Sequence, residues 1–387
     1  MRIRLRGRWR EGPGEERHLL AGIRGPLVTA LALLFPLLAG ACSPIYVVKA
    51  GIAEARILAG RRPIPEVLLD TATQEDVQGK LAYVWEARRF AADSLGLRVG
   101  DQYTSYTRLS RDTLALVLSA APVDALEPVT WWFPIVGRLP YRAYFDDQEA
   151  HEEQRSLEEE GYDTYLRPTA AFSTLGWFSD PLLSTVLRAE TVSVVETVYH
   201  ELAHTHLFVP GHVRFNESFA TFVGSVGSIA FFCGREGGGP RSVKCLRAKS
   251  SWSDLQRFSR FLDEVVAELE ALYAEPEVHR EELVTRKTRI MEDARERFRE
   301  VVLPELEIHR FSIFTDLPLN NATVLARMRY YHRLPDFQAF LDAHGGRLAD
   351  ALSAIEDGLP EVDDPWDLLP GNSLAEFRCT RPVAPVG

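Results

Sequence analysis

The chain has 387 residues, of which 46% are hydrophobic and 26% are charged, and its formal net charge is −11. This hydrophobic content supports a packed core and argues against an intrinsically disordered chain. The acidic balance argues against a nucleic-acid-binding protein, because such a protein presents a basic face to the phosphates.

Residues 1–41 are predicted to form a targeting segment that lies outside the fold. Seven arginines accompany an apolar run from Pro26 to Ala41, which is too short to span a membrane comfortably. The run ends in Leu-Ala-Gly-Ala before Cys42 and resembles a lipobox, in which Cys42 becomes the lipidated first residue. An ordinary secretory signal or a signal anchor is the alternative.

The residue after the lipidated cysteine indicates the membrane. Ser43 stands where an aspartate is associated with retention in the inner membrane. The resemblance to bacterial lipoproteins therefore implies a lipid anchor in the outer membrane, facing the periplasm. Without residues 1–41, which carry seven Arg and three Glu, the formal charge of the chain is −15.

Residues 42–65 are interpreted as a lipid-proximal tether and residues 66–345 as the main domain. The spacing of apolar residues predicts a helix over Val77–Leu97. Asp101–Ala121 alternates and predicts a β-hairpin or two strands. The acidic run Asp146–Glu160 is predicted to be a solvated helix.

Tyr165–Phe178 has strand character and precedes the most informative stretch of the chain. Within it, Ala170–Leu175 is our candidate for an edge strand that pairs with the backbone of a peptide substrate. A buried central strand is the alternative, because periodicity does not separate the two.

The stretch Glu196–Gly227 reads ETVYHELAHTHLFVPGHVRFNESFATFVGSVG and contains the motif HExxH. On an α-helix, residues four apart lie on one face, so His200 and His204 can share a metal ion. Glu201 lies one position round the helix and can reach a water beside that metal. A surface helix with chance histidines is the alternative.

A third ligand is expected from Glu217. We expect the first helix to stop at Pro210 and Gly211, and Asn216 to cap a second helix whose first turn carries Glu217. His212 is a weaker rival for this ligand. His206 lies on the wrong face of the first helix and is interpreted as a hydrogen-bonded structural residue.

Two imidazoles and one carboxylate suit one Zn²⁺ ion per chain and leave a position open for water, as in catalytic zinc sites. Glu201 would then be the general base that takes a proton from this water and passes it to the leaving amine. The predicted reaction is hydrolysis of a peptide bond.

The region after the predicted zinc site is expected to form a helical hairpin over residues 252–303, broken at Pro276. Its short length favours packing within the chain over a dimerising coiled coil. Cys233 and Cys245 flank a Gly-rich insertion and can form a disulfide in an oxidising compartment. Residues 346–387 are interpreted as a loose carboxyl-terminal tail, in which Cys379 is left unpaired.

HELAH followed by FNESFATFVG resembles the gluzincin arrangement, in which the glutamate of an NExxA segment completes the zinc site. The whole mature chain is similar to a bacterial family of predicted zinc aminopeptidases, usually lipoproteins. The further segments that carry this resemblance are Gly60–Ile64, Phe133–Gly137, Pro140–Arg142, Tyr144–Asp146, Ser173–Phe178, Asp180–Pro181 and Asn320–Ala322.

The resemblance implies that a tyrosine hydroxyl steadies the oxyanion, and Tyr330 or Tyr331 is the candidate. Two features depart from the well-studied aminopeptidases. Twelve residues separate His204 from Glu217, fewer than in that larger group, and the chain lacks a GxMEN-type segment for gripping a substrate amino terminus. The second departure leaves hydrolysis in place but opens the question of aminopeptidase specificity.

The sequence therefore predicts an α+β fold with a zincin core, gluzincin-like, and a helical hairpin subdomain. The predicted function is a zinc peptidase of the bacterial envelope, most specifically an aminopeptidase. The alternatives are an endopeptidase or amidase that uses the same site, and a scaffold lipoprotein with an idle zinc site.

Overall fold

The computed structural model describes residues 51–52, 55–111, 113–133, 137–169, 179–316 and 319–371. The predicted targeting segment, Cys42, Cys379 and the predicted edge strand Ala170–Leu175 lie outside these residues. The described elements are, in chain order, β1 (Arg61–Pro63), α3 (Ile64–Leu69), α4 (Glu75–Asp93), β2 (Ser105–Thr107), β3 (Ala115–Pro122), β4 (Trp131–Phe133), β5 (Gly137–Leu139), β6 (Arg142–Tyr144), α5 (Asp147–Glu159), β7 (Tyr162–Thr169), β8 (Leu182–Leu183), η1 (Val186–Arg188), α6 (Thr191–His206), α7 (Val213–Gly234), α8 (Val243–Tyr273), α9 (Arg280–Arg297), η2 (Phe298–Val302), η3 (Leu303–Glu305), α10 (Ser312–Asp316), α11 (Asn321–Tyr331), α12 (Leu334–Ala343), α13 (Leu348–Gly358), η4 (Leu359–Glu361) and η5 (Pro365–Leu368).

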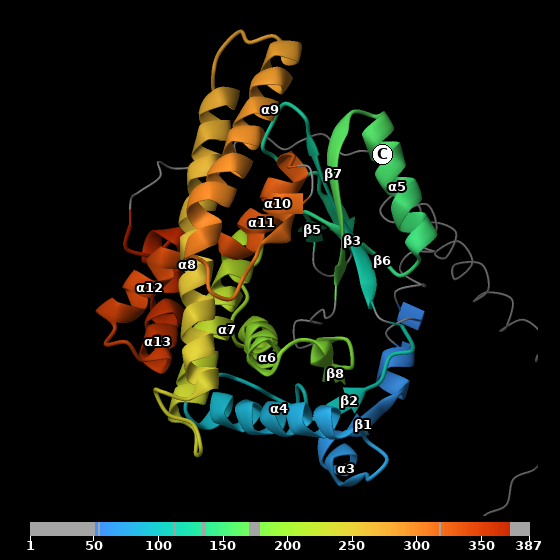
Figure 1. Ribbon diagram of the computed structural model, residues 1–387, viewed down its shortest axis with the longest axis vertical. Coiled ribbons are helices and arrows are strands. Elements are labelled where there is room, and N and C mark those ends of the chain that lie inside the picture. The colour runs from blue at the N-terminus through green and yellow to red at the C-terminus, as the bar shows by residue number, and fades with distance from the viewer. Residues whose placement is uncertain are drawn as a thin grey trace, which may run out of the picture.

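Helices surround small sheets (Figure 1). The strand order β6-β3-β7 makes an antiparallel sheet, and β1-β2-β8 makes a mixed one in which β2 and β8 run parallel. Helix α5 covers one face of the β3 sheet and α11 covers the other (Figure 1). Strand β3 contributes buried side chains to both faces of this sheet. Leu118 and Ala120 pack on the side of α5, and Ala121 packs on the side of α11.

Helix α7 runs through the centre of the main core and contacts α4, α6, α8, α11, α12 and α13. Its phenylalanines Phe215, Phe219 and Phe222 are completely buried. In the described part of the chain, α7 is the one helix long and apolar enough to cross a membrane, and 72% of its apolar stretch is buried inside the fold. Burial on this scale is what a core helix of a globular domain requires.

The region predicted as a helical hairpin contains two helices, α8 and α9, that lie side by side and extend from the core (Figure 1). Helix α8 begins at Val243, before the predicted start at residue 252. The first helix ends at Tyr273, shortly before Pro276. The sequence left open whether Cys233 and Cys245 pair, and the structure joins them: Cys233 at the end of α7 is bonded to Cys245 at the start of α8, with their Cα atoms 4.8 Å apart.

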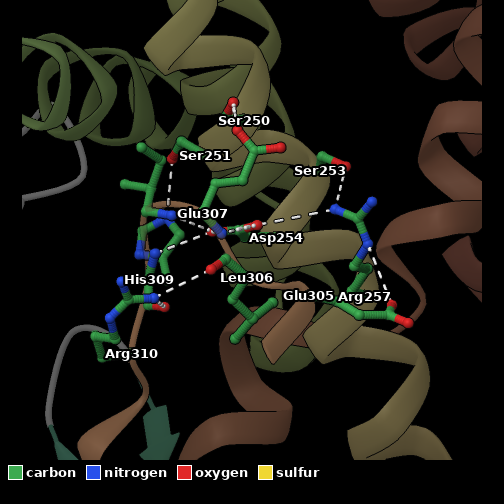
Figure 2. A network of polar contacts seen from close by, with 11 residues as sticks. Ser250, Ser251, Ser253, Asp254, Arg257, Glu305, Leu306, Glu307, His309 and Arg310 are labelled. Carbon is green, nitrogen blue, oxygen red and sulfur yellow. Dashed lines mark hydrogen bonds and ion pairs between the residues drawn. The ribbon is translucent and has the colours of Figure 1, made fainter. Parts of the chain in front are cut away.

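A buried carboxylate fixes α8 to the segment that follows α9 (Figure 2). Asp254 is completely buried and accepts hydrogen bonds from the backbone N–H groups of Glu307, Ile308 and His309 at 2.7–3.1 Å. Arg257 lies 3.8 Å from the same carboxylate. Charge-assisted bonds to backbone groups are stronger than neutral ones, so Asp254 determines the path of the chain on its return to the core.

The strands predicted within Asp101–Ala121 are present as β2 and β3, but they do not form a hairpin with each other. Strand β2 pairs with β1 and β8, whereas β3 pairs with β6 and β7. The hairpin alternative was therefore wrong. Local alternation indicates a strand but carries no information about its partner.

The predicted tether is part of the fold over its second half. Ile57 is 6% exposed and its carbonyl accepts a hydrogen bond from Thr107 Oγ1 at 3.0 Å. Strand β1 pairs with β2, and Ile64 is completely buried. The boundary predicted at residue 65 is therefore too late, since the packed structure includes the described residues from 55 onward.

The predicted loose tail is wrong for the described residues up to 371. Helix α13 buries Leu348, Ala351, Leu352 and Ile355 against the main core. Trp366 in η5 packs edge-on against the ring of Phe215, 5.3 Å away between centroids. The many prolines toward the chain end led to the prediction of a loose tail, and the short amphipathic helix that precedes them was missed.

Candidate metal centre

Helix α6 is held in place by its apolar face. Its buried residues include Val192, Val194, Val195, Val198, Tyr199, Leu202 and Ala203. The hydroxyl of Tyr199 donates a hydrogen bond to the carbonyl of Ala87 on α4 at 3.0 Å. This packing fixes the rotation of α6 and turns His200 and His204 together toward α7.

Two glycines allow α7 to approach α6 closely. A Cβ atom at Gly224 would lie 2.7 Å from the carbonyl oxygen of Glu196 and 3.4 Å from the Cβ of His200. A Cβ at Gly227 would lie 2.8 Å from the ring of Tyr199. Since real side chains do not approach so closely, glycine is needed at this crossing beside the first predicted ligand.

The connection between the two helices differs from the prediction. Helix α6 ends at His206, four residues before Pro210, and α7 begins at Val213, so Asn216 lies inside α7 and does not cap it. Instead, the Asn216 amide donates to the carbonyl of Val209 at 2.8 Å and accepts from its N–H at 2.9 Å. Asn216 thereby closes the loop one residue before the predicted third ligand.

The structure brings the three predicted ligands together. Glu217 Oε2 lies 3.2 Å from His200 Nε2 and 3.4 Å from His204 Nε2. One potential ligand atom from each of the three residues lies within 4.8 Å of the others, so they form a group that could hold a metal ion. Their side chains are 8–17% exposed, so the group is sheltered but open to solvent.

The chemistry of this donor set fits Zn²⁺. Two imidazole nitrogens and one carboxylate oxygen converge from two rigid helices, and this is a ligand combination found in catalytic zinc sites. One carboxylate oxygen lies 3.2 Å and 3.4 Å from the two imidazole nitrogens, so the three side chains form a compact donor set that could hold one metal ion.

The three residues are electrostatically coupled. Burial opposes the ionisation of Glu217, but the two imidazoles outweigh burial and hold the pKa of this carboxyl well below its usual range. Burial likewise opposes protonation of His204, yet the Glu217 carboxylate raises the pKa of the imidazole above its ordinary value. The group therefore carries an ionised carboxylate ready to bind a cation.

The predicted base occupies a different environment. Burial raises the pKa of Glu201, and the neighbouring histidines only partly counteract this effect. Asp180 and Tyr103 lie near Glu201. The Asp180 carboxylate further raises the pKa of Glu201. Burial raises the pKa of the Tyr103 hydroxyl, and the carboxylates of Glu201 and Asp180 raise it further. A carboxyl with a raised pKa is suited to proton transfer near neutral pH.

Neither of the two other histidines in the stretch joins the group. His206 accepts a hydrogen bond from the backbone N–H of Arg98 at 3.2 Å, and its Nε2 lies 3.7 Å from Glu356, so its predicted structural role is confirmed. His212 is the residue before α7, and its Nδ1 lies 4.0 Å from Asp364. Among the described residues, the metal-binding group contains Glu217 and not His212.

The two candidate tyrosines have different surroundings. The ring of Tyr330 lies 6.0 Å from the ring of His200, and its hydroxyl accepts a hydrogen bond from Arg167 at 2.9 Å. Tyr331 packs edge-on against the rings of Phe258 and Phe311. Tyr330 is therefore the tyrosine of this pair that lies at the site.

Sequence reasoning missed Tyr103, Tyr141, Arg167 and Asp180 as neighbours of the site. Glu217 raises the pKa of the Tyr141 hydroxyl, in addition to the larger effect of burial. Tyr141 and Asp180 lie in two segments that carry the family resemblance, and this was a usable signal. Tyr103 has a left-handed backbone, with φ at 56°, and no sequence pattern indicates that conformation.

Three comparisons with known proteins extend this description. A family model described as "Putative aminopeptidase" matches residues 45–360, which is most of the chain and includes the whole metal-binding group. No curated protein matches the chain, and no solved structure matches it either.

Proposed function

Since the chain belongs to this aminopeptidase family, we propose that it is a zinc-dependent peptidase that releases residues from the amino terminus of peptides. The observation that carries the zinc dependence is the convergence of His200, His204 and Glu217 within 4.8 Å. The proposed fold is a gluzincin-like zincin core, in which α6 supplies HExxH and α7 supplies the third ligand.

Each side chain has a separate task in this proposal. His200, His204 and Glu217 hold Zn²⁺, which when bound supplies a Lewis acid and lowers the pKa of water. Glu201 accepts a proton from the attacking water and passes it to the leaving amine. The Tyr330 hydroxyl donates a hydrogen bond to the oxygen of the scissile carbonyl as negative charge develops there.

The first experiment separates catalysis from metal binding. The purified full chain, loaded with zinc in detergent, is assayed on a library of free peptides beside Glu201→Gln. We expect Glu201→Gln to retain about one zinc per chain and to lose turnover, because the variant keeps all three ligands and lacks the base. Undiminished turnover in Glu201→Gln would exclude the proposed base.

The same library distinguishes the alternatives. An aminopeptidase loses activity when the substrate amino terminus is acetylated, whereas an endopeptidase or amidase does not. A zinc-loaded wild-type chain that cleaves neither set would favour the scaffold lipoprotein with an idle site. In that case a Glu201→Gln strain should behave normally where a deletion strain does not.

The proposed location is the bacterial envelope, with a lipid on Cys42. The sequence around Cys42 supports this, and the Cys233–Cys245 disulfide fits an oxidising compartment. Metabolic labelling with a radioactive fatty acid should mark the wild-type chain and not Cys42→Ser. Label that persists in Cys42→Ser would place any lipid elsewhere.

A further inference from the structure

Two arginine–tyrosine pairs join β7 to α11, and they are arranged reciprocally. Arg167 on β7 donates to the hydroxyl of Tyr330 on α11 at 2.9 Å. Arg327 on α11 donates to the hydroxyl of Tyr165 on β7 at 2.8 Å. In each pair the guanidinium also lies over the partner ring, 5.5 Å and 5.7 Å from its centroid.

The geometry of the elements explains this reciprocity. Tyr165 and Arg167 are two apart on a strand and therefore point to the same face of the sheet. Arg327 and Tyr330 are three apart on a helix and share the face that meets this sheet. Both pairs therefore link β7 to α11 by the same kind of hydrogen bond, and the two donor–acceptor distances are nearly equal.

The two pairs differ in what lies beside them. Tyr330 is 6.0 Å from His200, and Glu217 acts electrostatically on both Tyr330 and Arg167. Tyr165 packs instead against the hydrophobic cluster between α8, α9 and α11. Only the Arg167–Tyr330 pair adjoins the metal-binding group.

The direction of the hydrogen bond determines where the tyrosine proton can go. A guanidinium has donors only, so Tyr330 must accept from Arg167 and its own O–H remains available as a donor. The Arg167 guanidinium lies on one side of the Tyr330 oxygen, and its positive charge also stabilises negative charge that develops on the opposite side. The Tyr330 O–H is thus a hydrogen-bond donor whose oxygen is held in place by Arg167.

We propose that Arg167 is a positioning residue that orients the Tyr330 hydroxyl toward the developing oxyanion of the peptide substrate. This inference rests on the proposed peptidase function and goes beyond it, because it assigns a role to a residue outside the zinc motif. The reciprocal pair Arg327–Tyr165 joins the same two elements through the same kind of hydrogen bond, and its tyrosine packs against the hydrophobic cluster, so it supplies the matched control.

The test compares Arg167→Gln and Arg327→Gln in the zinc-loaded full chain, with zinc content and melting temperature measured for each. We expect Tyr330→Phe to lower kcat by about 10²-fold, as loss of an oxyanion donor does. Arg167→Gln should lower kcat by about tenfold to 10²-fold with little change in KM, because misplacement of a group has effects of this size. Arg167→Lys should recover part of the loss, and Arg327→Gln should leave kcat unchanged.

A double variant tests whether Arg167 acts through Tyr330. Arg167→Gln should cause no further loss of kcat in the Tyr330→Phe background, because residues that act as one unit are not additive. Binding of a phosphinic peptide, an analogue of the transition state, is measured by calorimetry as a readout independent of turnover. Arg167→Gln should weaken its binding, and Arg327→Gln should not.

Three results would overturn the proposal while leaving the peptidase function intact. These are an unchanged kcat in Arg167→Gln, equal losses in Arg167→Gln and Arg327→Gln, or an undiminished effect of Arg167→Gln in the Tyr330→Phe background. A wild-type chain that cleaves no peptide would instead remove the proposed function, and the role of Arg167 with it.

Discussion

His204 and His212 lie close in sequence, but only His204 belongs to the metal-binding group among the described residues. We predict that His204→Ala binds zinc at least about 10²-fold more weakly than wild type, because two protein ligands remain where catalytic zinc sites have three. His212→Ala should retain about one zinc per chain. Competition with a chromogenic chelator measures both affinities.

Glu196 carries a buried carboxyl whose Oε1 has no hydrogen-bond partner. Burial raises its pKa to about 7, although a hydrogen bond from Ser251 opposes the shift. Because the folded state holds this proton more tightly than the unfolded state, the contribution of Glu196 to stability is present at pH 4 and is lost as the pH rises through 7.

The prediction is that Glu196→Gln removes this dependence. Relative to wild type, the variant should gain roughly 3 kcal/mol in the free energy of unfolding between pH 4 and pH 8. Urea unfolding of both chains at several pH values measures the difference, in which the other titrating groups cancel. A difference that stays constant with pH would contradict the assignment.

At the scale of single residues, the histidine spacing and the following glutamate sufficed to predict which three side chains converge. Their spacing is local, and helix geometry converts it directly into proximity. Arg167 and Tyr330 are 163 positions apart, and Tyr103 depends on a strained backbone angle. Such neighbours depend on tertiary packing, which no local pattern encodes.

At the scale of elements, the close approach of α6 and α7 has a measurable requirement. In Gly224→Ala the new methyl group would lie 2.7 Å from the Glu196 carbonyl oxygen, so the helices must separate. We predict a loss of about 1–3 kcal/mol in the free energy of unfolding, together with weaker zinc binding, because His200 and Glu217 lie on opposite sides of the crossing.

Gly234 supplies the control for this substitution. It lies at the end of the same helix, and a Cβ there would have no neighbour within 4 Å. Gly234→Ala should change stability by less than about 1 kcal/mol and leave zinc affinity unaltered. Equal effects of the two substitutions would show that the crossing does not depend on glycine.

Helices α4, α8 and α9 were predictable because their apolar residues repeat clearly, and α5 was predicted from its acidic run. The start of α7 was not. Asn216 has the usual chemistry of a helix cap, but its side chain binds the Val209 backbone from inside the helix. The side chain of Asn216 is thus used in a contact with the Val209 loop, although its type favours a position at the start of a helix.

At the scale of the whole molecule, the described end of the chain belongs to the core. We predict that Ile355→Ala, at a completely buried position in α13, lowers the free energy of unfolding by about 2–5 kcal/mol. Ser353→Ala, on the exposed side of the same helix, should change it by less than about 0.5 kcal/mol. Denaturant unfolding of the full chain distinguishes this from a loose tail, for which both substitutions would be neutral.

The fold class shows where sequence reasoning stops at this scale. Mixed helices and strands were expected, and the structure has both. The separation of β2 and β3 into different sheets, the inclusion of residues 55–65 and the docking of α13 were not expected. Each depends on contacts between distant segments, which alternation and composition do not specify.

Helix α13 also bears on how the protein matures. Glu356 reaches the last turn of α6, where it lies 3.7 Å from His206 and 2.5 Å from Arg98. Ribosomes make a chain from its amino end, so the helices that carry His200, His204 and Glu217 are synthesised before α13. In a growing chain, the last turn of α6 therefore lacks its contact with Glu356 until α13 has been made.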